Sequence, residues 1–322
     1  MLGLGHSLVA GSALDSAYVM TKSYAFDATD DIFLTNTVNG NAPADGTAKT
    51  INRSLSVAAW ARVDDDSADP YTDGSAGVIV SANNTSTGWH LYYSNNRFYF
   101  TCLYDNGDDT NFSHTVNSGY NKMRAPTSGT DYTRYLYKSD HWHFVVATIN
   151  MEDPSTSVIT NLYVDGNRAQ AGDTGGSGST NFGSEPETSS SKKTTNASGG
   201  NIILRYDSSY DRDEVDLAIG AHASFTQATD ASGYRSSGFY GQIGDVAIWE
   251  NHVLTEGEIA TLYNLHVPID MATVQNTKLI GHWSPTRGND DLVSGTTGTL
   301  LDDAAAVTES PSLDVSGYAG YQ

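Results

Sequence analysis

The sequence has few basic residues, a single cysteine and no long apolar run. Lys and Arg total 17 against 38 Asp and Glu in 322 residues, which gives a formal net charge of −21. Nucleic acid and anionic membrane surfaces are bound by clustered positive charge, so neither is an expected partner. No stretch approaches the ~20 apolar residues of a membrane-spanning helix. Cys102 has no second cysteine to pair with, so an intrachain disulfide is excluded.

Glutamate is also scarce, because 30 of the 38 acidic residues are Asp and only 8 are Glu. Asp favours turns and helix caps, since its short side chain bonds nearby backbone groups, whereas Glu is the better helix former. Together with 31 Gly this composition predicts many turns and little helix. The chain still has 19 Tyr, 9 Phe and 5 Trp, which is ample material for a core and excludes wholesale disorder.

Alternation of apolar and polar residues with a period of two is the main pattern, and it predicts β-strands. In residues 55–63 it places five apolar side chains, from Leu55 to Val63, on one face and Trp60 on the other. Asp165–Gly166 predicts a hairpin turn. Cys102 falls in one of these strands and is predicted to be a buried, inert thiol. The other predicted strands are residues 22–27, 31–35, 77–81, 88–93, 97–104, 142–150, 160–164, 202–206, 217–220, 238–249 and 278–283.

One helix is predicted after the last strand of this set. Thr255 and Glu258 form a capping box, and Leu254 and Ile259 occupy the positions of a hydrophobic staple. Gly257 costs about 1 kcal/mol relative to Ala, so the helix should be short. Residues 171–200 contain 19 Gly, Ser and Thr, which predicts a long mobile loop inserted into one domain.

Several segments, taken in order, resemble the concanavalin A-like jelly roll of the laminin-G-like family. They are residues 23–31 (SYAFDATDD), 54–60 (SLSVAAW), 142–148 (WHFVVAT), 162–166 (LYVDG), 217–220 (LAIG) and 241–263 (GQIGDVAIWENHVLTEGEIATLY). The resemblance implies an all-β jelly-roll sandwich of two antiparallel sheets, with one short helix. We expect this sandwich at residues 21–265, an N-terminal arm at 1–20, and a strand followed by an extended arm at 266–322.

The glycoside hydrolases of this fold carry a strand motif of the form E-x-D-x-E or E-x-D-x-x-E. Retaining hydrolysis needs two carboxyl groups about 5 Å apart, one as nucleophile and one as acid/base. Glu214 and Asp216 match the start of the motif, but the final Glu is replaced by Ala218 or Ile219. The chain is therefore predicted to have no catalytic residues and not to be an enzyme. The rival hypothesis is a polysaccharide hydrolase or lyase, such as a phage depolymerase.

Metal and sugar sites are predicted only in outline. His141 and His143 share a strand face, but two His are an incomplete zinc site. Relatives with a laminin-G-like fold bind Ca²⁺ at the rim of the sandwich, and the run with Asp105, Asp108 and Asp109 is our first choice for such a site. The alternative, a solvated acidic loop, stays open. Candidates for stacking on sugars are Tyr residues in loop-like sequence, namely Tyr71, Tyr120 and Tyr132.

The sequences of the two terminal regions indicate where the protein acts. Weakly apolar arms need a neighbour for their backbone hydrogen bonds, and the N-terminus lacks the basic and apolar regions of a signal peptide. Residues 4–8 and 279–288 are similar to segments that flank laminin-G-like domains in predicted structural proteins of marine tailed phages. This resemblance implies a virion surface protein, namely a capsid decoration, a fibre or a tail-associated adhesin. Expected partners are capsid or tail proteins, further copies of the chain and host glycans; a calcium-dependent extracellular lectin is the other reading.

Overall fold

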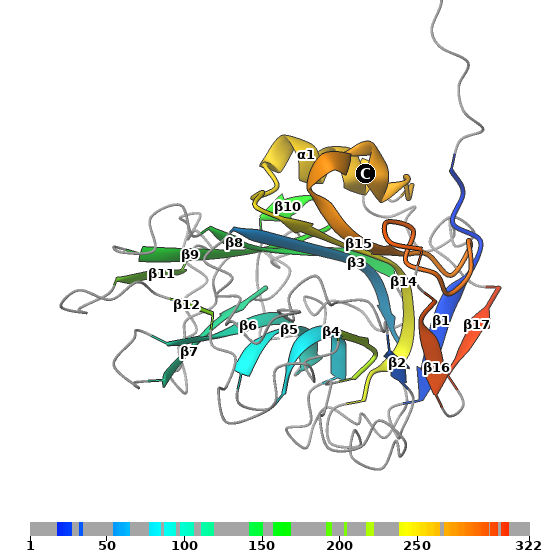
Figure 1. Cartoon of the computed structure of the whole chain (residues 1–322), viewed down its shortest axis with the longest axis horizontal. Coiled ribbons are helices and arrows are strands. Elements are labelled where there is room, and N and C mark those ends of the chain that lie inside the picture. Colours follow the sequence, from blue (N-terminus) through cyan, green and yellow to red (C-terminus); the bar gives the residue numbers. More distant parts are fainter. Residues whose placement is uncertain are drawn as a thin grey trace, which may run out of the picture.

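A computed structural model of the chain describes residues 18–27, 32–34, 54–64, 77–84, 87–94, 97–105, 111–118, 142–150, 157–168, 191–194, 203–204, 217–221, 238–264, 267–295, 297–301 and 304–308. Within these residues the strands form two sheets, and every strand pair is antiparallel. The sheets lie face to face, and α1 (Glu256–Tyr263) lies over the outer side of one of them (Figure 1). The predicted all-β sandwich of two antiparallel sheets with a short helix is confirmed, whereas the jelly-roll topology stays a prediction.

Sheet A has nine strands among the described residues. Their order is β10 (Asn167–Arg168), β9 (Ser157–Val164), β8 (Trp142–Asn150), β3 (Leu55–Val63), β14 (Tyr240–Glu250), β1 (Ser23–Asp27) and β17 (Ala305–Val307), with β11 (Ser191–Thr194) also on β9 and β15 (Leu279–Trp283) also on β14. Along one edge of β14, residues 240–243 pair with β1 and residues 246–249 pair with β15. Gly244 and Asp245 lie between them and oppose Trp60 alone in β3, which makes a β-bulge. The bulge thus lies where β1 begins and β15 ends.

Sheet B has eight strands in the described part of the chain. Their order is β12 (Ile203–Leu204), β6 (Arg97–Asp105), β5 (Thr87–Ser94), β4 (Gly77–Asn84), β13 (Ala218–Ile219), β2 (Ile32–Leu34) and β16 (Thr299–Leu301), with β7 (Asn111–Asn117) also paired with β6. The sequence missed β7, and it also missed β11, which falls within the predicted mobile loop 171–200. Both are polar strands at the side of a sheet, where the apolar alternation that marks a core strand is weak.

The alternating pattern of β3 sorts its side chains between two cores. The face from Leu55 to Val63 packs between the sheets, in an inner cluster that also holds Cys102. Trp60 lies on the outer face of sheet A, where its ring is 5.1 Å from the ring of Phe144 and 6.3 Å from that of Tyr263 in α1. Both faces of sheet A are therefore buried, one by sheet B and one by α1 and the residues after it. The burial predicted for Cys102 is confirmed.

The helix begins as its sequence predicts. Thr255 and Glu258 make both hydrogen bonds of the capping box, and Asn264 ends the helix in the left-handed region. Leu254 and Ile259, the staple residues, are buried in the outer cluster. The helix has eight residues, in keeping with the early Gly257. No helix in the described ranges is long and apolar enough to cross a membrane.

Glu258→Gln is expected to lower the free energy of unfolding by about 1 kcal/mol near neutral pH and by little in strong acid. Burial alone would raise the pKa of Glu258, but hydrogen bonds from the Thr255 backbone, His252, Gln275 and the Thr255 hydroxyl lower it from 4.5 to about 2. Because the folded-state pKa is lowered, this contribution is present above pH 4.5 and is lost as the pH falls towards 2.

Urea unfolding of the wild type and the Glu258→Gln variant between pH 7 and pH 2 measures this difference. Glu256→Gln, at an exposed position of the same turn, is the control and is expected to cost about 0.5 kcal/mol or less. A gap between wild type and Glu258→Gln that stays constant down to pH 2 would contradict the assignment.

The chain after α1 folds back onto the sandwich. Two short 3-10 turns, η7 (Met271–Thr273) and η8 (Asn276–Lys278), lead into β15, which confirms the strand predicted at 278–283. Further on, β16 pairs with β2 in sheet B and β17 pairs with β1 in sheet A.

The described parts of both predicted arms are docked on their own chain. Residues 284–295, 297–301 and 304–308 are not an extended arm, because their backbone groups have partners in both sheets and in the turns between them. Tyr18 and Met20, from the predicted N-terminal arm, also pack on sheet A. Residues 1–17 and 309–322 lie outside the described part of the chain.

Candidate functional site

The predicted calcium site can be placed only at its first residue. Asp105 is the last residue of β6 and pairs with Asn111 in β7 and Ile203 in β12. Asp108 and Asp109 lie outside the described residues, so this site stays a prediction. Among the described residues, no group of three or more His, Cys, Asp or Glu side chains is placed to hold a metal ion.

The incomplete hydrolase motif ends inside the sandwich. Glu214 and Asp216 lie outside the described residues, but Ala218 and Ile219 form β13 and are fully buried. Ile219 belongs to the inner core and pairs with Val80 and Phe33. Neither position offers a second carboxylate. The absence of enzymatic activity stays a prediction.

His143 has a structural partner in the hairpin turn after β9. Its Nδ1 lies 2.8 Å from Asp165 Oδ2, and the other oxygen of Asp165 accepts the backbone N–H of Phe144 at 3.0 Å. The imidazole is almost buried, and its ring packs edge-on against Phe98 of sheet B. His141, its predicted companion, lies outside the described residues, as do Tyr71, Tyr120 and Tyr132.

The outer face of sheet B carries a row of aromatic side chains that the sequence did not single out. Trp89, Leu91 and Tyr93 of β5 point into the inner core, so the residues between them, His90 and Tyr92, lie on the opposite face. The same alternation in β6, with Phe98, Phe100 and Cys102 inside, puts Tyr99 on the outer face. We call His90, Tyr92 and Tyr99 the aromatic row. The sequence could have indicated this row, because its three residues occupy the positions of the alternating pattern that lie between the core residues of β5 and β6.

The rings of the aromatic row contact one another. Tyr92 and Tyr99 are direct neighbours across β5 and β6, with ring centroids 5.0 Å apart and planes 11° from parallel. The imidazole of His90 lies 4.8 Å from the ring of Tyr92. All three side chains are half-buried. Burial raises the pKa of Tyr92, and a hydrogen bond with Thr101 offsets part of that rise, so the phenol stays protonated at neutral pH.

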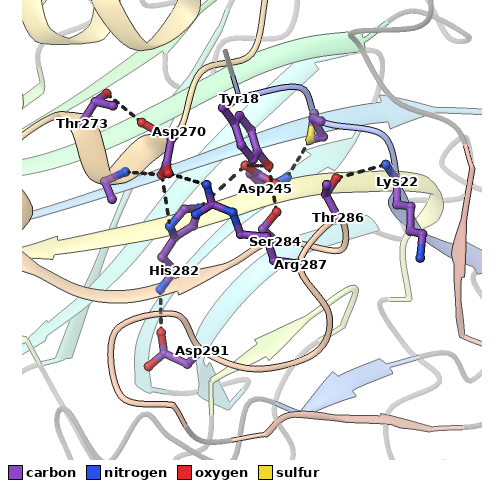
Figure 2. A network of polar contacts seen from close by, with 12 residues as sticks. Tyr18, Lys22, Asp245, Asp270, Thr273, His282, Ser284, Thr286, Arg287 and Asp291 are labelled. Atoms are coloured by element: carbon purple, nitrogen blue, oxygen red, sulfur yellow. Dashed lines mark hydrogen bonds and ion pairs between the residues drawn. The ribbon is translucent and has the colours of Figure 1, made fainter. Parts of the chain in front are cut away.

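A second cluster of polar side chains lies at the bulge of sheet A (Figure 2). The Tyr18 hydroxyl is 2.5 Å from Asp245 Oδ2 and 2.8 Å from Ser284 Oγ. A phenol has one proton, which Tyr18 donates to the carboxylate, so Ser284 donates to the phenol oxygen. Burial, followed by the charge of Asp245, raises the pKa of Tyr18 far above its ordinary value. The Arg287 guanidinium carbon lies 4.8 Å from the centre of the Tyr18 ring.

His282 is fully buried between two carboxylates in this cluster. Its Nε2 is 3.7 Å from Asp245 Oδ2, and its Nδ1 is 3.9 Å from Asp270 Oδ1, which are contacts too long for direct hydrogen bonds. Asp245 Oδ1 and both ring nitrogens have no hydrogen-bond partner among the described residues. Asp245, His282 and Ser284 are buried, whereas Asp270 and Arg287 at the rim of the cluster are partly exposed. The contacts of the cluster hold together chain segments that are far apart in the sequence.

Asp270 joins this cluster to the segment after α1. It caps η7 by accepting the Ala272 N–H at 3.0 Å, and it accepts Arg287 Nη2 at 2.6 Å. Burial alone would raise the pKa of Asp270, but the hydrogen bond from Arg287 and that from Ala272 outweigh it and hold the pKa below its ordinary value. Burial would likewise lower the pKa of Arg287, and the bond to Asp270 raises it instead. The Asp270–Arg287 pair is therefore charged at neutral pH.

Comparison with known proteins does not assign the chain to a family. No family model and no curated protein matches the sequence. Among solved structures the chain is similar to the receptor-binding domain of botulinum neurotoxin D, with 13% identity and a TM-score of 0.40, over 78% of this chain and 46% of that chain. The receptor-binding domain of a C/D mosaic serotype gives 14% identity and a TM-score of 0.37, over 78% and 43%. A third structure concerns the entry of botulinum neurotoxin type C into cells, which depends on interaction with two ganglioside molecules. It gives 15% identity and a TM-score of 0.31, over 67% of this chain and 36% of that chain.

The chain thus spans less than half the length of these chains. Similarity at this level carries no conclusion about what the present protein binds.

Proposed function

We propose that this protein is a non-enzymatic recognition protein, which presents the outer face of sheet B to glycans as a structural protein of a virion surface. The observation that carries the proposal is the aromatic row, in which Tyr92 and Tyr99 stack at 5.0 Å beside His90 on the outer side of the sandwich. On that virion the protein would be a capsid decoration, a fibre or a tail-associated adhesin.

The aromatic row has the composition of a recognition surface. Tyr side chains combine a large rigid apolar ring with a hydroxyl and lose little conformational entropy on binding. Ligand sites typically combine such rings with a few polar groups that fix orientation, and the hydroxyls of Tyr92 and Tyr99 and the imidazole of His90 provide these here. The pyranose ring of a sugar has the matching chemistry, since it offers an apolar C–H face and a polar rim of hydroxyls.

Tyr99→Ala is expected to weaken glycan binding about 5- to 30-fold, because it removes one ring of the stacked pair and about 1 to 2 kcal/mol of contact. A glycan array with the wild type identifies a ligand, and calorimetry with that glycan measures the loss. The same array with a chelator tests whether calcium takes part.

Two variants control this experiment. Tyr99→Phe keeps the ring and is expected to bind within a few-fold of wild type, while Leu292→Ala changes an exposed apolar residue of the loop after β15 and should leave binding unchanged. An array without a ligand, or unchanged affinity after Tyr99→Ala, contradicts glycan binding through this face.

The particle location is supported by the resemblance of residues 4–8 and 279–288 to segments of phage structural proteins. Residues 279–288 form β15, which is a strand of sheet A, and the turn after it. Contacts with capsid or tail proteins, or with further copies of the chain, therefore have residues 1–17 and 309–322 as their candidates. Cross-linking mass spectrometry of purified particles tests this, and cross-links from these residues to the same chain alone would contradict it.

A further inference from the structure

Residues 18–22 are docked on sheet A without being part of a strand, and we call them the strap. Met20 is fully buried, and its sulfur accepts the Asp245 N–H at 3.3 Å. The backbone N–H groups of Thr21 and Lys22 donate to Thr286 Oγ1 at 2.8 and 3.2 Å. The strap is thus held by side chains, where β1 just after it is held by strand pairing.

The surface that holds the strap belongs largely to the C-terminal part of the chain. Ser284, Thr286 and Arg287, from the turn after β15, contact the strap, together with Asp245 of the bulge (Figure 2). Because β1 begins and β15 ends at this bulge, the strap and residues 284–287 leave sheet A side by side. The strap contacts the Ser284 hydroxyl and the Thr286 hydroxyl, and these two residues contact the Tyr18 hydroxyl and two backbone N–H groups of the strap.

The strap can be closed, lying on sheet A as described, or open, detached from it, and different contributions favour each state. Burial of Met20 and of part of Tyr18 favours the closed state, as do the hydrogen bonds to Asp245 and Thr286. Against this, closure removes the Asp245 carboxylate from water while its Oδ1 stays without a hydrogen bond among the described residues. Opening would hydrate this carboxylate, and that gain offsets part of the lost contacts.

The turn at 284–287 is also connected to the strands that follow it. The carbonyl of Gly288 accepts the Tyr24 hydroxyl at 3.1 Å, and the carbonyl of Asn289 accepts the Gly298 N–H at 2.8 Å. Gly298 directly precedes β16 and packs on the ring of Phe33, so a Cβ there would come within 2.2 Å of it. A displacement of the turn therefore reaches the edge strand of sheet B within a few residues.

We propose that the strap and residues 284–287 form a clasp, whose opening releases the N-terminal segment and loosens the C-terminal strands together. The strap opens as one unit, because its contacts converge on Asp245 and Thr286. A force or a partner acting on the chain before Tyr18 then acts on β16 and β17 through the clasp. This inference does not depend on glycan binding.

Hydrogen exchange of the full chain, read by mass spectrometry at neutral pH, tests the clasp. Tyr18→Phe removes the hydroxyl that joins Asp245 and Ser284, and Thr286→Val removes the acceptor of two backbone N–H groups with little change of volume. Each variant is expected to speed exchange about tenfold or more in peptides covering 18–27 and in peptides covering 284–307, with 77–105 unchanged. Thr261→Val, an exposed hydroxyl that donates only to Gly257 O within α1, is the matched control and should change neither region.

Three results would overturn the proposal. Faster exchange confined to 18–22 shows a strap that opens without the C-terminal strands. Faster exchange that includes 77–105 shows a general loss of stability. Unchanged exchange in both variants shows that these contacts do not control opening. Tryptic cleavage after Lys22 and Arg287 gives a second readout, since both sites should become sensitive together.

Discussion

Asp291→Ala is expected to lower the free energy of unfolding by about 3 to 5 kcal/mol. The carboxylate is buried and accepts the backbone N–H of His282 at 2.9 Å, that of Val293 at 3.1 Å and that of Ser294 at 3.2 Å, as well as the Ser294 hydroxyl at 2.7 Å. Alanine leaves these donors without their acceptor, and that of His282 lies in the buried strand β15. Urea denaturation followed by tryptophan fluorescence measures the loss.

The neighbouring Asp290 provides the control for this prediction. Its side chain is exposed and accepts a hydrogen bond from Thr297 Oγ1 at 2.6 Å. Asp290→Ala is expected to cost about 1 kcal/mol or less. If Asp291→Ala cost no more than Asp290→Ala, the buried carboxylate would not be what holds residues 291–294 against β15.

Gly220→Ala is expected to destabilise the fold by about 2 to 5 kcal/mol, through two separate causes. Gly220 has φ +89°, a conformation that costs a residue with a Cβ about 1 to 2 kcal/mol. A Cβ would also lie 2.2 Å from the ring of Phe26, which is buried between the sheets, so the core must shift. The backbone here is fixed by hydrogen bonds to Ile79 and from Phe239, which leaves little room to relax.

Gly295→Ala separates the two causes. Gly295 has φ +75°, and a Cβ there would meet nothing within 4 Å, so only the backbone cost applies. Thermal and urea unfolding of both variants should show Gly220→Ala as the more damaging by about 1 to 3 kcal/mol. Equal effects would mean that the ring of Phe26 yields without cost.

The sandwich could be predicted because its signals are local. The alternation of residues 55–63, the Asp165–Gly166 turn and the capping box at Thr255 each depend on residues a few positions apart, and each has the conformation expected. The polar strands β7 and β11 were missed since they give no such signal. The described part of the predicted C-terminal arm differs from the prediction for a related reason, because weakly apolar sequence does not show that its backbone will find partners in its own sheets.

The polar cluster could not be predicted from the sequence at all. Tyr18 and Asp245 are 227 positions apart, and Tyr18 and Ser284 are 266 apart. Nothing local marks any of them as partners, and the β-bulge that brings Asp245 to this place is visible only in the register of β14 against β3. The aromatic row could have been predicted in part. Once β5 and β6 are recognised as core strands, the alternation of side chains places Tyr92 and Tyr99 on the outer face.

The C-terminal edge strands have a consequence for how the chain folds. Ala25 pairs with Ala305, and Phe33 pairs with Leu300, so β1 and β2 can complete their pairing only after the much later β17 and β16 have been synthesised. Contacts at such separations give a high contact order, which slows folding because a long loop must close before they form. Until residue 307 has left the ribosome, β1 and β2 each expose an edge. An unpaired strand edge can pair with another chain, so β1 and β2 are exposed to aggregation during this interval.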